Sequence, residues 1–255
     1  MRNKIAIVTG ASRAGGIGAA ICRELAKKGN DIFFTYFTPY DYLSGYQDAS
    51  CTWPDEFKQE LSELGVRAEG VELDLSDPLA PFRLLEQAGN QLGVPSILIN
   101  NATHCAEVNF QKLTNEILDD HYAVNVRGTC MLSVEFAKRL VGKTGGRIIN
   151  LISGQDKGPM PGNLAYVTTK GAISAFTVSL AAELAPHQIT VNAMDPGPTD
   201  TGWMDGQLKE YLKPKFPMGR IGTPEDAARL AAFLASDDAD WITGQIIHSD
   251  GGFWD

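Results

Sequence analysis

The sequence predicts an α/β fold with a parallel sheet covered by helices on both faces. Three observations support this. Short apolar runs alternate with amphipathic segments along all 255 residues. The apolar runs carry few polar residues on either face, as strands that are buried from both sides require. A glycine-rich turn joins the first apolar run to the first amphipathic segment. Because strand–helix alternation implies right-handed crossovers, we expect one doubly wound, seven-stranded domain over residues 1–255.

The elements can be placed in order. The expected strands are 4–9, 31–37, 67–74, 96–100, 147–153, 189–195 and 244–250. The expected helices are 17–28, 55–64, 79–91, 114–140, 164–185 and 224–235. Thr223 followed by Pro224 marks a helix start, because a capping side chain precedes a proline of the first turn.

Composition and charge exclude several classes. The net charge is −9 and no basic stripe is available for phosphates, so we expect no nucleic-acid partner. No apolar run reaches the ~18–20 residues of a membrane span. With no His/Cys cluster we expect no metal, and the cysteines (Cys22, Cys51, Cys105 and Cys130) read as free thiols. The first strand begins within five residues of Met1, which leaves no room for a signal peptide, so we expect a cytoplasmic protein.

Residues 38–54, "TPYDYLSGYQDASCTWP", interrupt the alternation. They are rich in Tyr, Ser, Asp and Pro and show no clear periodicity. A loop of this length in a compact domain is usually functional or mobile. We favour a surface insertion without a catalytic role, and leave open whether it contributes to a pocket.

Residues 9–18, "TGASRAGGIG", form the turn between the first strand and the first helix. Backbone N–H groups and a helix N-terminus favour an anionic phosphate, and glycines let the backbone approach it closely. This context predicts a Rossmann-type dinucleotide site, although a glycine turn alone is weak evidence. Five residues separate Gly10 from Gly16, so Gly10 takes the first role and Gly16 and Gly18 take the others.

The second expected strand suggests which dinucleotide binds. An acid at its end would hydrogen-bond a ribose 2′-hydroxyl and repel a 2′-phosphate. The strand ends instead in Thr35, Tyr36 and Phe37, with no acid until Asp41. Arg13 could supply the charge that a 2′-phosphate requires, or could be a solvated surface charge. We expect NADP(H), with NAD(H) as the alternative.

Tyr166 and Lys170 stand four residues apart in an expected helix and share a face. A Lys ammonium beside a phenol stabilises the phenolate and lowers the Tyr pKa. Such a phenol can exchange a proton with an alcohol or carbonyl oxygen, and Ser153 could hydrogen-bond the same oxygen. The pair alone is common by chance.

Several further motifs follow one another along the chain. They are "TGASRAGGIG", "LDLSD" with Asp74, "NNAT" at 100–103, "HYAVNVRG" with Asn125, Ser153 thirteen residues before Tyr166, and "DPGPTDT" at 195–201. With these motifs the whole chain resembles the short-chain dehydrogenase/reductase family. Thr103 replaces the glycine that the family has there, and the glycine loop has two extra residues. "PMGRIGTPEDAA" and "ADWITGQIIHSDGG" resemble its 3-oxoacyl-acyl-carrier-protein reductase branch.

The resemblance implies roles. Tyr166 would donate a proton to the carbonyl oxygen and Ser153 would polarise that oxygen. Lys170 would lower the Tyr166 pKa and hold the nicotinamide ribose, and Asn125 would hold a water. The expected cofactor-binding residues are Gly10, Ser12, Arg13, Gly16, Ile17, Gly18, Tyr36, Asp74, Leu75, Asn101, Ala102, Tyr166, Lys170, Pro196, Gly197, Thr199 and Thr201.

It also implies a substrate lid at about 199–217 and a homotetramer or homodimer formed through the helices at 114–140 and 164–185. Ketones or secondary alcohols are the expected substrates, with a 3-oxoacyl thioester favoured, either free or bound to an acyl-carrier protein. Because the chain is acidic, whereas an acidic carrier protein prefers a basic docking patch, a sugar, polyol or steroid-like ketone is the alternative. Enoyl reduction is less favoured, because those relatives have a longer Tyr-to-Lys spacing. A dinucleotide sensor without catalysis is the competing class.

The four histidines are read as structural. His104 is taken as an ordinary loop residue that could also face substrate. His121 is expected at a helix surface or packed, and His187 and His248 have no acid or nucleophile at a telling spacing.

Overall fold

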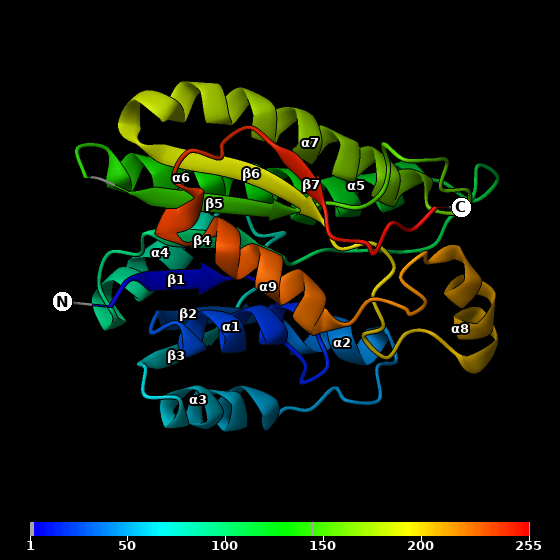
Figure 1. The fold of residues 1–255 in the computed structure, drawn as a ribbon, viewed down its shortest axis with the longest axis horizontal. Helices are drawn as coiled ribbons and strands as arrows, with labels where there is room; N and C mark the ends of the chain where they lie inside the picture. The colour runs from blue at the N-terminus through cyan, green and yellow to red at the C-terminus, as the bar shows by residue number, and fades with distance from the viewer. Residues whose placement is uncertain (1–2, 144, 255) are drawn as a thin grey trace.

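The computed structural model describes residues 3–143 and 145–254, and its centre is a parallel sheet (Figure 1). The strand order is β3-β2-β1-β4-β5-β6-β7, and every neighbouring pair is parallel. The strands are β1 (Ile5–Val8), β2 (Asp31–Tyr36), β3 (Ala68–Glu72), β4 (Ile97–Asn100), β5 (Gly146–Leu151), β6 (Ile189–Asp195) and β7 (Ile246–His248). The seven expected strands and their parallel arrangement are confirmed.

Helices cover both faces of the sheet. The α-helices are α1 (Ile17–Lys27), α2 (Thr38–Leu43), α3 (Trp53–Glu63), α4 (Ala80–Gln91), α5 (Asn115–His121), α6 (Thr129–Leu140), α7 (Leu164–Leu184), α8 (Gly206–Leu212) and α9 (Pro224–Leu234). Buried side chains of α1, α3 and α9 form one core with the sheet, and those of α4, α6 and α7 form the other. The apolar strands thus separate two cores, which explains why both of their faces lack polar residues.

Two expectations about helices need correction. The segment 38–54 contains α2, which starts at Thr38 with Pro39 in its first turn. The expected helix 114–140 is divided, because a π-helical segment, Tyr122–Gly128, separates α5 from α6. A π-helical turn adds a residue to the helical repeat and is frequent at functional sites. The segment contains Asn125.

The sheet topology determines where a ligand fits. β1 lies between β2 and β4, so the direction in which strands are added reverses at β1. Loops at the carboxyl ends of β1 and β4 therefore separate and leave a crevice, which is the usual ligand site of such sheets. None of the helices in the described ranges has the length and apolar character that a bilayer span requires.

Candidate active site

The glycine loop requires glycine at two of its positions. Gly10 has φ +73°, and a Cβ there would lie 2.8 Å from the Cα of Ala102. A Cβ on Gly18 would lie 2.5 Å from the carbonyl oxygen of Gly10. The Asn101 amide donates to the carbonyl oxygens of Thr9 and Gly10 at 2.8 and 3.0 Å, so β4 holds the loop in place. The missing side chains therefore let the glycine loop, the start of α1 and the residues after β4 pack closely against one another.

A cavity of about 430 Å³ opens beside this loop. Eleven of the expected cofactor residues line it: Gly10, Ser12, Arg13, Gly16, Ile17, Tyr36, Asp74, Leu75, Asn101, Ala102 and Thr201. The others, Gly18, Tyr166, Lys170, Pro196, Gly197 and Thr199, do not. Gly16 is the N-cap residue of α1, so the helix N-terminus faces this region. A glycine-lined cavity at a helix N-terminus fits a dinucleotide.

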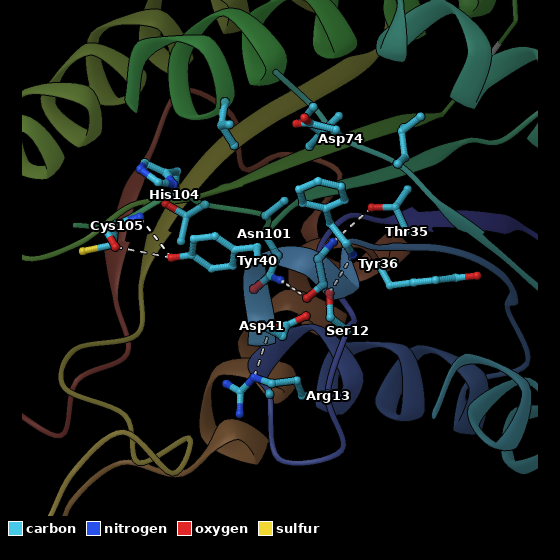
Figure 2. A pocket seen from close by; sticks show the side chains of 18 of the residues that line it. Ser12, Arg13, Thr35, Tyr36, Tyr40, Asp41, Asp74, Asn101, His104 and Cys105 are labelled. Carbon is cyan, nitrogen blue, oxygen red and sulfur yellow. Dashed lines mark hydrogen bonds and ion pairs between the residues drawn. The ribbon is translucent and has the colours of Figure 1, made fainter. Parts of the chain in front are cut away.

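The segment 38–54 forms a wall of the cavity that the sequence did not reveal. Tyr40, Asp41, Leu43 and Tyr46 line it, so the segment is more than a surface insertion. Figure 2 shows Tyr40 and Asp41 projecting from α2 between the glycine loop and the loop that follows β4. A proline in the first turn of α2 is the sequence signal that could have revealed this helix, because proline is favoured at helix starts.

Arg13 is engaged by this segment. Its guanidinium lies 2.6 Å from a carboxylate oxygen of Asp48 and 3.5 Å from one of Asp41, and its side chain is 8% exposed. It also stacks 3.5 Å above the ring of Tyr46 and donates to the carbonyl oxygen of Thr201 at 3.2 Å. The alternative of a solvated surface charge is therefore wrong.

Tyr166, Lys170 and Ser153 lie together at the carboxyl end of β5. The Lys170 ammonium donates to the Leu151 carbonyl oxygen at 2.8 Å and lies 5.4 Å from the Tyr166 ring centroid. Burial lowers the pKa of Lys170 to about 8. Burial raises the pKa of Tyr166 above its ordinary value, although a hydrogen bond with Ser153 acts in the opposite direction. The expected lowering of the Tyr166 pKa is thus not met in this structure, because the effect of desolvating the phenolate is larger than the effect of the hydrogen bond with Ser153.

Asn125 connects the π-helical segment to its surroundings. Its amide oxygen accepts from the backbone N–H of His104 at 2.7 Å and from the Thr103 hydroxyl at 3.1 Å. Its amide nitrogen donates to the His104 carbonyl oxygen at 2.9 Å and to the Thr169 hydroxyl at 3.0 Å. Because Thr169 precedes Lys170 in α7, Asn125 connects the loop after β4 to the helix that carries Lys170. Thr103 fills a hydrogen-bonding role that a glycine could not.

Two histidines lie beside this loop. His121 is completely buried, and its ring accepts from the Ala106 backbone N–H at 3.1 Å. His104 lines the cavity, with its ring 5.6 Å from that of Tyr40. Burial lowers the pKa of His104.

His248 has acidic neighbours that its sequence position did not reveal. Its ring nitrogens lie 2.9 Å from Asp195 and 3.3 Å from Asp156. Atoms of Asp195, His248 and Asp250 that could act as metal ligands lie within 4.8 Å of one another. The ammonium of Lys157 pairs with Asp250, so a cation already neutralises part of this group.

The fold and this site define a nicotinamide-dependent oxidoreductase, and comparisons with known proteins place it more narrowly. The model of a family described as Enoyl-(Acyl carrier protein) reductase matches residues 10–254. An uncharacterized oxidoreductase, YjdA of Bacillus subtilis (strain 168), is 56% identical over 254 residues, which cover 99% of this chain and 97% of the relative. The 3-oxoacyl-[acyl-carrier-protein] reductase FabG of Aquifex aeolicus is 32% identical over 257 residues, with coverage of 100% and 98%.

Solved structures agree. The short-chain dehydrogenase/reductase from Serratia marcescens BCRC 10948 superimposes with a TM-score of 0.87 at 33% identity, covering 99% of this chain and 98% of that one. A blue fluorescent protein from a metagenomic library, in complex with NADPH, gives 0.86 at 33% identity, with coverage of 98% and 97%. The chain belongs to the short-chain dehydrogenase/reductase family and is an enzyme of that family.

Proposed function

We propose that this enzyme reduces a ketone to a secondary alcohol with NADPH, or catalyses the reverse oxidation. One observation carries the proposal. Tyr166, Lys170 and Ser153 converge at the sheet edge that also bears the glycine-lined cavity. A dinucleotide in that cavity would have its phosphates at the N-terminus of α1. Tyr40 and Cys105, which line the cavity, also lie close enough to the Tyr166 phenol to affect its pKa.

Each residue then has a task. The Tyr166 phenol, kept protonated by its burial, donates a proton to the carbonyl oxygen. The Ser153 hydroxyl holds the same oxygen and polarises it. Lys170 positions the nicotinamide ribose, and Asn125 holds the loop and the catalytic helix in register. The nicotinamide, when bound, supplies the hydride.

Two features support NADP(H) over NAD(H). β2 ends at Tyr36 without an acid to repel a 2′-phosphate. Arg13 lines the cavity and carries a positive charge suited to that phosphate. A structural neighbour was solved with NADPH. The ion pair of Arg13 with Asp48 also bears on this preference.

Among substrates we favour a 3-oxoacyl thioester, which an acyl-carrier protein could present. The similarity to the Aquifex aeolicus reductase supports this class. The four-residue spacing of Tyr166 and Lys170 favours carbonyl over enoyl reduction. A sugar, polyol or other small ketone is the second candidate, because the net charge of −9 opposes an acidic carrier.

We further propose a substrate lid over residues 199–217. Met204, Leu212 and Phe216 are buried there against one another, whereas Trp203 and Tyr211 are largely exposed. A short helix on so small an apolar cluster can move as a unit, and closing it would exclude water from the reaction.

We also propose a cytoplasmic homodimer or homotetramer. Met131 on α6 and Val178 on α7 are 43% and 49% exposed, so both helices carry apolar side chains that a second copy could cover. Sedimentation of the purified protein checks the oligomeric state.

The test of function follows cofactor absorbance with a panel of carbonyl compounds. Acetoacetyl thioester, simple 2-ketones, reducing sugars and a crotonyl thioester are each mixed with the enzyme and NADPH or NADH. We expect turnover with acetoacetyl thioester and NADPH, and none with the enoyl substrate. Turnover on a sugar alone would replace the thioester assignment. Cofactor binding without turnover on any carbonyl with NADPH or NADH, and on any alcohol or sugar with NADP+ or NAD+, would favour a sensor.

A further inference from the structure

Contacts on both sides of the cavity hold the segment 38–54 in place. On one side, Asp48 and Asp41 engage Arg13 of the glycine loop. On the other side, the Tyr40 hydroxyl accepts from the backbone N–H of Cys105 at 3.1 Å. Cys105 follows the loop that Asn125 holds, so the segment spans from the phosphate side of the cavity towards the catalytic side (Figure 2).

In its pairing with Asp41 and Asp48, the Arg13 guanidinium binds carboxylates as it would bind another anion. A guanidinium fork matches a carboxylate and a phosphate in the same way. Arg13 is the only Lys or Arg among the described residues that line the cavity. Asp48 therefore occupies the guanidinium that a 2′-phosphate in this cavity would need as its partner.

The two carboxylates differ in how readily they can leave. Asp41 stands on α2 with its side chain 10% exposed. Asp48 lies outside any helix with its side chain 36% exposed, and also accepts from the Gly15 backbone N–H at 3.1 Å. Water can solvate Asp48 when it is released, whereas releasing Asp41 would leave a buried charge unpaired. Asp48 is thus the partner that an incoming anion can displace.

We propose that Asp48 competes with the 2′-phosphate of the cofactor for Arg13, so that NADP(H) binding displaces Asp48 and loosens residues 44–52, whereas NAD(H) leaves the pair closed. Asp48 is then a determinant of cofactor specificity located outside the glycine loop and β2. The inference rests on the proposed use of a nicotinamide dinucleotide, and its tests measure binding without turnover. A failure to reduce ketones would count against the function alone.

The first test compares dissociation constants for NADP+ and NAD+ by calorimetry. Asp48→Asn should shift the affinity ratio towards NADP+ by roughly tenfold, because one charge-assisted hydrogen bond no longer competes. Asp238→Asn removes the same charge from an exposed residue in the turn Asp237–Ala239 and should leave the ratio unchanged. A ratio for Asp48→Asn within about twofold of wild type, on the same scale, would overturn the proposal.

Simple repulsion by Asp48 is a different explanation, and an Arg13→Ala background separates the two. Competition requires Arg13, so in that background Asp48→Asn should change the ratio by less than about threefold. If repulsion alone acts, the effect of Asp48→Asn persists at full size or grows, and the proposal fails.

The second test uses the wild-type protein, so it decides even if Asp48→Asn does not fold. Hydrogen–deuterium exchange of residues 44–52 is measured with saturating NADP+ and with saturating NAD+. Exchange should be faster with NADP+, because only the 2′-phosphate displaces Asp48. Equal exchange, or slower exchange with NADP+, would contradict the proposal.

Discussion

The ammonium of Lys170 donates to the carbonyl oxygen of Leu151, 2.8 Å away at the end of β5. The Lys170 residue is 4% exposed. A backbone carbonyl supplies only a partial charge, so the ammonium is poorly compensated for its loss of water. Burial of Lys170 therefore lowers the stability of the fold, at a position where we propose that it binds the nicotinamide ribose and acts on the Tyr166 phenol.

The pH dependence of stability should show this cost. The pKa of Lys170 is lowered from 10.5 to about 8 by burial. The unfolded chain then binds more protons than the folded chain between those values, so stability should rise as pH increases through that window. Lys170→Met should raise the free energy of unfolding at pH 7 by roughly 1–3 kcal/mol and abolish turnover.

Urea denaturation of the cofactor-free protein at pH 7 and pH 10 measures both effects. The difference in unfolding free energy between the wild type and Lys170→Met should shrink at pH 10, where folded Lys170 is neutral. A methionine variant that is less stable than wild type at pH 7 would show that the lysine is well compensated.

Asn125 should be important for stability as well as for activity. Asn125→Ala removes the acceptor of the half-buried His104 N–H and one of the two partners of the Thr169 hydroxyl, which still donates to the Tyr166 carbonyl oxygen. We expect a loss of roughly 2–4 kcal/mol in unfolding free energy. Asn115→Ala, at an exposed position on α5, is the matched control and should change stability by less than about 0.5 kcal/mol. Chemical denaturation measures the unfolding free energy of both variants. Equal losses of stability in the two would contradict the proposed role of Asn125 in bridging the loop and the helix.

Substitution of Gly18 tests the packing of the glycine loop. A Cβ at this position would meet the Gly10 carbonyl oxygen at 2.5 Å, so the loop backbone must shift. Gly18→Ala should weaken dinucleotide binding by at least about tenfold and lower stability by roughly 1–3 kcal/mol. Gly89→Ala, in α4 with open space around it, should instead gain up to about 1 kcal/mol. Fluorescence titration with NADPH measures the affinity, and unchanged binding in Gly18→Ala would contradict the assigned loop role.

Local patterns in the sequence predicted the framework well. Apolar runs identified all seven strands, and most clearly the five inner ones, because burial on both faces leaves little freedom of composition there. Gly10 and Gly18 could be singled out because the positive φ of Gly10 and the close contacts of both residues depend on a missing side chain.

Long-range pairing was harder to predict. Asp48 meets Arg13 across thirty-five positions, and His248 meets Asp195 across fifty-three. No periodicity encodes such contacts, because the path of the intervening chain brings the partners together. The pKa of Tyr166 was misjudged for a related reason, since residue spacing shows a neighbouring charge but does not show desolvation.

Tyr166→Phe tests the central claim most directly. The variant removes one hydroxyl at the carboxyl end of β5 and leaves the glycine loop intact. Steady-state reduction of a carbonyl substrate that the wild type accepts is measured beside NADPH affinity. We expect turnover to fall by roughly 10²–10⁴-fold, with NADPH affinity nearly unchanged. Turnover near the wild-type rate would contradict the role of Tyr166 as proton donor and the mechanism built on it.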